Sequence, residues 1–283
     1  RAYAEPVSGP PAATVLRGAY QDVSSGYHTQ VAFAAAREQL ADTEQRALEE
    51  HRLAARLQEA ITPRVASPAV APGLEVAARY RPAESGAIVS GDWYDILPLP
   101  DQQTLLVIGD IAGHGLSAVT GMVALRNALR GQAAASDEPA ALLGWLNQTA
   151  CHYSGGVMGT GLCGRFDPVS KTLRWARAGH LPPVAVRDGQ ARLLGWPAGV
   201  MLGLDADSRY DEAATSLRQG DVVVLYTDGL IERRDEPLGI TISRLLESAS
   251  SREADTARYA DHLLEQAAPS TEDDACLVAV RVC

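Results

Sequence analysis

Lysine is almost absent from this sequence: Lys171 is the only one among 283 residues, and the formal net charge is -10. Because binding to a nucleic-acid backbone needs clustered lysine and arginine, we do not expect a nucleic acid as a partner. Apolar runs long enough to span a membrane are also lacking, and no signal peptide is visible. We therefore expect a cytoplasmic protein that makes no membrane contact.

Cysteine is scarce as well. The four cysteines form no CxxC pair and match the spacing of no zinc site, which favours reduced thiols in a cytosolic protein. The chain begins with Arg1 rather than with methionine, which suggests a trimmed or processed fragment of a longer protein. The cysteines are Cys151, Cys163, Cys276 and Cys283.

The first part of the chain divides into two predicted segments. Residues 1–30 carry prolines, glycines and serines and are expected to form a loose N-terminal tail. Residues 31–61 are free of glycine and proline, and apolar residues recur there at about sevenfold spacing, which predicts a helix. This helical linker, 31–62, has two interpretations. It either pairs with a copy of itself as a homodimerisation helix or lies as a single amphipathic helix on its own domain.

The remaining chain, 63–283, reads as one domain of short strands between turn residues. Hairpins such as the one predicted across Asp188-Gly189 link the strands, and helices are inserted in pairs. This order indicates an α+β fold with layered antiparallel sheets rather than alternating βαβ units. Strands are expected at residues 74–80, 104–108, 173–178, 184–186, 191–194, 222–226 and 276–282, and helices after residue 115, from residue 139, at 242–246 and at 257–267.

Aspartates occupy four short motifs that adjoin predicted strands or turns. The motifs are SGDWYD with Asp92, GDIAGHG with Asp110, LYTDGL with Asp228, and TEDDACLVAV with Asp273 and Asp274. Each motif alone is typical of a turn or of a solvated strand end. As a set they suggest a shared site, because Asp110 and Asp228 both end strongly apolar strands and Asp273 begins one.

If those strands lie in neighbouring sheets, their carboxylates converge at one edge. Converging carboxylates raise one another's pKa, and bound cations remove that penalty. A site made only of oxygen atoms suits Mg2+ or Mn2+ rather than zinc. Two such ions about 4 Å apart can share a bridging carboxylate and a water, and this arrangement serves phosphoryl hydrolysis without a protein nucleophile.

Five motifs occur in the order SGDWYD, GDIAGHG, ARAGHLPPVAV, GDVVVLYTDGLIE and EDDACLVAV. In this order they resemble the motifs of bacterial metal-dependent serine/threonine phosphatases of the PPM (protein phosphatase 2C-like) superfamily, in its SpoIIE/RsbU branch. The resemblance covers about Leu74 to Val282. It implies an αββα sandwich, in which two antiparallel sheets lie between helical layers.

The resemblance also implies roles for individual residues. Asp110 matches the ligand that bridges two metal ions, and the backbone carbonyl of Ile111 matches the position that completes one metal's shell. Asp110 and Asp228 are therefore the candidate catalytic residues. The remaining carboxylate ligands match Asp92, Asp228 and Asp273. Asp95, in the same segment as Asp92, is a weaker candidate for supporting the ligands.

The glycines and histidines of these motifs receive supporting roles. Gly113, like its neighbouring glycines, would let the loop pass close to the metals. His114 could be a general acid that protonates the leaving oxygen. In the eukaryotic relatives such a histidine follows the bridging aspartate at closer spacing, so a loop-structuring role is favoured here. His180 is likewise expected to be structural, orienting the turn that follows it.

One departure from the family pattern adjoins Asp274, itself a candidate for supporting the ligands. Family members carry threonine or serine two places after this position, where the chain has Cys276. The departure affects a supporting hydrogen bond and leaves all four carboxylate ligands present.

The function implied by the resemblance is removal of phosphate from serine or threonine of a phosphoprotein, with two Mn2+ or Mg2+ ions. The substrate of this branch is typically a STAS-domain anti-anti-sigma factor in a partner-switching pathway. Two alternatives stay open. One is a catalytically silent binding or regulatory module with the same fold, and the other is a small-molecule phosphoesterase with the same metal site.

Overall fold

The structure is a computed structural model, and it divides the chain into two compact units, Arg1–Glu49 and Glu50–Cys283. The boundary falls inside a helix, so the predicted three-part division of the chain stays a prediction. The residues that the structure describes are 2–7, 15–20, 24–61, 69–81, 91–113, 115–136, 138–152, 156–233, 236–266 and 274–283.

The first unit contains regular structure where the sequence predicts a loose tail. Strands β1 (Ala2–Val7) and β2 (Val15–Tyr20) pair as an antiparallel ladder. Pro6 is tolerated in β1 because both strands of a two-stranded sheet are edge strands. Helix α1 (Ser24–Ile61) confirms the predicted helix but begins earlier than Val31. Of the described helices, none is long and apolar enough to cross a membrane.

The second unit contains two antiparallel sheets, as predicted. The six-stranded sheet has the order β10-β9-β12-β13-β4-β3, and the five-stranded sheet has the order β11-β8-β7-β6-β5. The strands are β3 (Ala69–Ala71), β4 (Leu74–Arg81), β5 (Trp93–Pro98), β6 (Thr104–Ile111), β7 (Gly159–Asp167), β8 (Thr172–Ala178), β9 (Val184–Arg187), β10 (Gln190–Leu193), β11 (Glu212–Ser216), β12 (Val222–Tyr226) and β13 (Ala275–Val282). The helices are α2 (Gly115–Gln132), α3 (Pro139–His152), η1 (Asp228–Leu230), α4 (Leu238–Ala249) and α5 (Thr256–Gln266).

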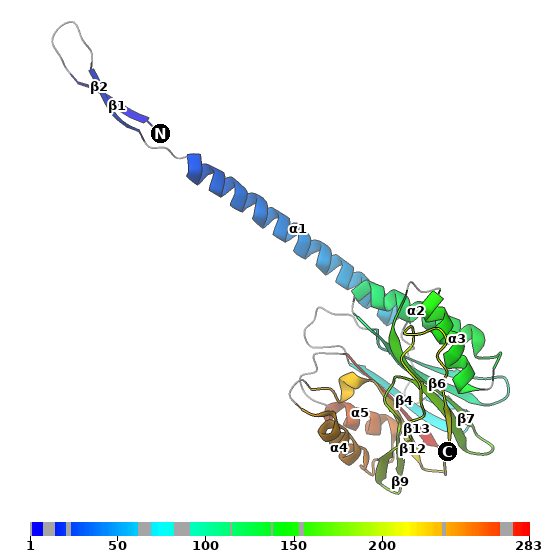
Figure 1. The fold of residues 1–283 in the computed structure, drawn as a ribbon. Helices are drawn as coiled ribbons and strands as arrows, with labels where there is room; N and C mark the ends of the chain where they lie inside the picture. Colours follow the sequence, from blue (N-terminus) through cyan, green and yellow to red (C-terminus); the bar gives the residue numbers. More distant parts are fainter. Residues whose placement is uncertain are drawn as a thin grey trace. The chain divides into compact units, whose positions relative to one another are not determined.

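Side-chain alternation along the strands builds four layers. In β6, Leu106 and Ile108 face the core between the two sheets, whereas Leu105 and Val107 face the core under α2 and α3. The six-stranded sheet packs its other face against α4 and α5. Figure 1 shows this order, with α2 and α3 over the sheet that contains β6 and β7, and α4 and α5 beside the sheet that contains β12 and β13. The fold is therefore the predicted αββα sandwich.

The apolar strands were the most predictable elements. All five residues of β12 are buried, as expected for a strand covered on both faces. The turn between β9 and β10 has positive φ at Asp188 (52°) and Gly189 (75°), as the predicted hairpin requires. The sequence did not predict β7, because its three glycines lower the β-propensity of a strand that is nevertheless buried.

Candidate functional site

Asp92 and Asp110 lie at the same end of the five-stranded sheet. In the ladder between β5 and β6, Trp93 is opposite Gly109. One step further along both strands, the register puts Asp92 opposite Asp110. The Asp92 side chain is buried, with the residue only 2% exposed, whereas Asp110 is half-buried.

The loop after β6 approaches the segment before β5 closely. The backbone N–H of Ile111 donates to the carbonyl oxygen of Gly91 at 3.3 Å. A Cβ atom on Gly91 would lie 2.4 Å from the carbonyl oxygen of Ile111, so glycine is required there. Gly113 has a φ of 101°, in the region that favours glycine. His114 lies outside the described residues, and its predicted role is untested.

Asp228 and Asp274 lie at one end of the six-stranded sheet. Asp228 opens η1 one residue after Thr227, which follows β12, and Asp274 directly precedes β13. A Cβ atom on Gly229 would lie 1.9 Å from the carbonyl oxygen of Asp274, so the two segments touch. The hydroxyl of Tyr80 in β4 donates to the buried carboxylate of Asp274. Asp273 lies outside the described residues.

A hydrogen bond joins the two sheets at these ends. The hydroxyl of Thr227, between β12 and η1, donates to Oδ2 of Asp92 at 2.8 Å. Since Asp92 and Asp110 are neighbours in one sheet and Thr227 adjoins Asp228 in the other, the four described aspartate segments meet at one place. We call this place the acidic edge, defined by Asp92, Asp110, Asp228 and Asp274.

Metal binding at the acidic edge stays a prediction. Within the described ranges, no group of three or more histidine, cysteine, aspartate or glutamate side chains is arranged to hold a metal ion. The electrostatics nevertheless fit a cation. Burial raises the pKa of the Cys276 thiol well above its ordinary value, and the charges of Asp92 and Asp274 raise it further. A divalent cation would relieve this concentration of negative charge.

Asp95 is not brought to the acidic edge. Side chains alternate along β5, so Asp95 lies on the helix-covered face while Tyr94 faces the core between the sheets. The carboxylate of Asp95 pairs with Arg126 at 3.2 Å and with Arg130 at 2.5 Å, both in α2. Its described partners therefore fasten α2 to β5.

The family model for stage II sporulation protein E (SpoIIE) matches residues 100–283 of this chain. The chain belongs to the SpoIIE family. The predicted resemblance to the SpoIIE/RsbU branch is thereby confirmed.

Individual relatives of this SpoIIE-family chain point the same way. The chain is 24% identical over 216 residues to the phosphoserine phosphatase RsbU of Bacillus subtilis, and the match covers 74% of this chain and 63% of RsbU. The crystal structure of the RsbU and RsbW domains of Rv1364c from Mycobacterium tuberculosis has a TM-score of 0.68 at 33% identity, covering 75% of this chain and 61% of that one. The chain thus spans less than two thirds of each of these relatives.

A third comparison concerns the fold. The structure of the PP2C phosphatase domain with a fragment of the regulatory domain of SpoIIE from Bacillus subtilis has a TM-score of 0.64 at 19% identity, covering 74% of this chain and 63% of that one. At this identity the likeness supports the αββα architecture alone. It agrees with the layers that the side-chain clusters define.

In this SpoIIE-family chain His180 is a structural residue that links the two sheets. Its Nδ1 lies 2.8 Å from the hydroxyl of Thr160 in β7, and its Nε2 lies 3.0 Å from the carbonyl oxygen of Tyr226 in β12. Because a carbonyl only accepts, Nε2 carries the proton and Nδ1 accepts from Thr160. Thr160 is opposite Asp110 in the β6–β7 ladder. The histidine therefore spans from the neighbour of Asp110 to the end of β12.

The protonation of His180 predicts a pH dependence of stability. Burial lowers its pKa from 6.5 to about 4, and the nearby Arg177 charge adds to this effect. Because the folded pKa lies below the unfolded value, the resulting stability is complete above about pH 6.5 and is lost as the pH falls towards 4. The full difference corresponds to at most about 3 kcal/mol. Urea unfolding at several pH values should show this loss, and it should be smaller in His180→Gln; equal pH dependence in both proteins would contradict the assignment.

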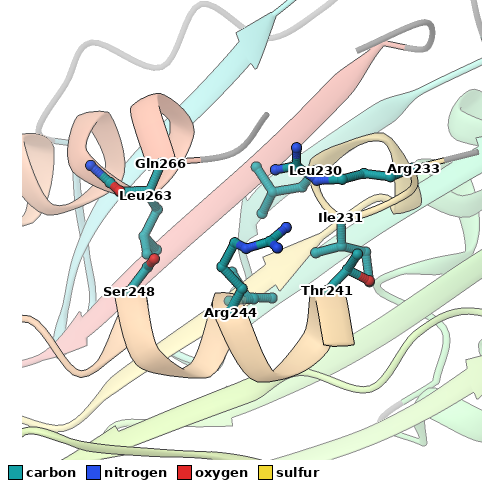
Figure 2. Close-up of a pocket in the computed structure, with 9 residues that line it drawn as sticks. Leu230, Ile231, Arg233, Thr241, Arg244, Ser248, Leu263 and Gln266 are labelled. Carbon is teal, nitrogen blue, oxygen red and sulfur yellow. The ribbon is translucent and has the colours of Figure 1, made fainter. Parts of the chain in front are cut away.

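A small cavity lies near η1 but on the helix-covered side of the six-stranded sheet. Figure 2 shows Arg244 extending from α4 toward Arg233 and Leu230. The cavity's volume of about 20 Å³ has room for a single water. Glu236 pairs with Arg244 at 2.8 Å and with Arg233 at 3.8 Å. The cavity therefore lies apart from the acidic edge, and its two arginines already have a carboxylate partner in Glu236.

Three residues at or near the acidic edge were not among the predicted site residues. Thr227 and Tyr80 each donate to one of its carboxylates, and Thr160 supports it through His180. Thr227 lies inside the motif LYTDGL, which already contains Asp228, so its place near the acidic edge could have been predicted from the sequence. Tyr80 and Thr160 could not have been predicted in this way, because their contacts exist only after the strands pair.

Proposed function

We propose that this chain is a Mg2+- or Mn2+-dependent protein serine/threonine phosphatase. The observation that carries the proposal is the hydrogen bond from Thr227 to Asp92, which joins the aspartate-bearing ends of two sheets. The family, and its phosphoserine phosphatase member RsbU, support the same activity.

The residues that would hold the ions are Asp92, Asp110 and Asp228, together with the predicted Asp273 and the carbonyl of Ile111. When bound, divalent ions supply a water of lowered pKa and positive charge for the phosphate oxygens. The chain itself fixes where its carboxylates lie. Thr227 holds Asp92, and the β6–β7 ladder holds Asp110 opposite Thr160. No side chain then has to act as a nucleophile.

The proposed substrate is a phosphorylated STAS-domain anti-anti-sigma factor in a cytoplasmic partner-switching pathway. Two relatives support this class. One is a phosphoserine phosphatase, and the other carries RsbU and RsbW domains in one structure.

The proposal is tested by incubating the purified chain with phosphorylated STAS-domain proteins of the same genome, with and without Mn2+. Intact-mass spectrometry should show loss of one phosphate only when Mn2+ is present. A preference for nucleotide or sugar phosphates over every phosphoprotein would favour a small-molecule phosphoesterase. Metal binding without any turnover would favour the silent regulatory module.

We also propose that α1 mediates homodimerisation. All described side chains between residues 31 and 49 are exposed, among them Phe33 (66%), Leu40 (59%) and Leu48 (50%). Apolar side chains this exposed on a helix favour a partner helix.

Replacing Leu40 and Leu48 with Glu should convert a dimer to a monomer in sedimentation equilibrium. The control is Val169→Glu, at a residue that is 91% exposed in the other unit; a monomeric wild-type chain would contradict the proposal.

A further inference from the structure

The hydroxyl of Thr227 has two partners that lie on different sheets. Its oxygen accepts from the backbone N–H of Cys276 in β13 at 2.8 Å. The same group lies 2.8 Å from Oδ2 of Asp92, which precedes β5. A carboxylate accepts and cannot donate, so the single hydroxyl proton points to Asp92. A longer contact of 3.4 Å to the carbonyl of Cys276 competes only weakly for that proton.

The surroundings leave this hydroxyl little freedom. Thr227 is 0% exposed, and its backbone N–H donates to the carbonyl oxygen of Cys276 at 3.0 Å. β-Branching restricts the threonine side chain to few rotamers. A hydrogen bond to a charged carboxylate is stronger than one between neutral groups. The bond therefore fixes the Asp92 carboxylate relative to the backbone that carries Asp228.

A second contact between the two sheets involves Tyr226, the residue before Thr227. The carbonyl of Tyr226 accepts from His180, which in turn accepts from Thr160 beside Asp110. Two consecutive residues at the end of β12 thus connect to both aspartate positions of the opposite sheet. Of these contacts, only the Thr227 hydroxyl touches a predicted ligand directly.

We propose that Thr227 is a positioning residue, whose hydroxyl sets the Asp92 carboxylate at the distance and angle that metal binding by Asp92, Asp110 and Asp228 requires. This inference rests on the proposed function. Groups that orient metal ligands in this way typically change metal affinity or activity by about 10–100-fold when removed.

The test compares Thr227→Val, which keeps the shape but removes the hydroxyl, with Thr227→Ser, which keeps the hydroxyl. Mn2+ binding to the full chain is measured without substrate, from the electron paramagnetic resonance signal of free Mn2+. Thr227→Val should weaken Mn2+ binding by about 10–100-fold, and Thr227→Ser should restore it to near the wild-type value. Hydrolysis of an aryl phosphate, followed against Mn2+ concentration, should shift in parallel.

The matched control is Thr104→Val. Thr104 is a buried threonine in β6 whose hydroxyl has no hydrogen-bond partner among the described residues. This variant should bind Mn2+ like the wild-type chain. If Thr227→Val does not fold, Thr227→Ala removes the same hydroxyl with less crowding and takes its place.

The outcomes separate the two proposals. A wild-type chain that neither binds Mn2+ nor hydrolyses phosphate overturns the proposed function, and this inference with it. An active wild-type chain whose Thr227→Val variant binds Mn2+ equally well overturns the inference alone. A Thr227→Val variant that only loses thermal stability, or a Thr227→Ser variant that fails to recover binding, also overturns it, because a purely structural role would give that result.

Discussion

Asp110→Asn and Asp228→Asn are each expected to lower Mn2+-dependent phosphatase activity by about 10³-fold or more, which is about 4 kcal/mol of transition-state stabilisation. Each change keeps the shape of the side chain and removes its negative charge. Asp110 and Asp228 are both half-buried at strand ends, so a neutral amide can be accommodated. The expected loss therefore reflects cation binding rather than folding.

The measurement is the initial rate of phosphate release from a phosphoprotein at saturating Mn2+, with circular dichroism to confirm the fold. The control is Asp188→Asn in the β9–β10 turn. Asp188 has a φ of 52°, a conformation that asparagine tolerates well, and this turn adjoins the opposite end of β12. Its activity should match that of the wild-type chain. Full activity of either Asp110→Asn or Asp228→Asn would remove the basis for an aspartate metal site.

The sequence predicted the acidic edge in outline because apolar strands are the strongest signal in this chain. β6 and β12 are read easily from continuous apolar runs, and an aspartate at the end of such a run must lie at the end of a sheet. The convergence of the ends could only be hypothesised. Thr227 and Asp92 are 135 positions apart, and no local pattern predicts which strand ends of two stacked sheets will touch.

The position of Asp95 on the helix-covered face of the sheet could have been predicted from the sequence. Asp92 and Asp95 are three residues apart, and side chains in a strand alternate between faces. They therefore point to opposite faces of the sheet once SGDWYD is recognised as the start of β5. No strand was predicted in this segment, and the family resemblance alone placed Asp95 near Asp92. Recognising β5 would have assigned Asp95 to the helix-covered face.

That position makes Asp95→Asn the substitution with the largest expected effect on stability. The side chain of Arg126 is only 5% exposed. Burial lowers the pKa of its guanidinium, and the negative charge of Asp95 acts against this lowering. Removing the carboxylate takes the charge of Asp95 away from a buried cation, and breaking a buried ion pair in this way typically costs about 3–5 kcal/mol. Arg130 loses less, because its side chain is 41% exposed and can turn to water.

Urea unfolding is expected to show this loss as a lower midpoint at unchanged slope. The control is Asp261→Asn, which removes the carboxylate that pairs with Arg79. The Asp261 side chain is 51% exposed and that of Arg79 20%, against 2% and 5% for Asp95 and Arg126, so the loss at Asp261 should be smaller than at Asp95 because Arg79 reaches water more easily. Replacing Asp95 with Leu and Arg126 with Met together should recover most of the stability, because a packed apolar pair avoids the buried charge. Equal losses in Asp95→Asn and Asp261→Asn would mean that this cluster does not hold α2 against β5, since a buried pair and a more exposed one would then contribute alike.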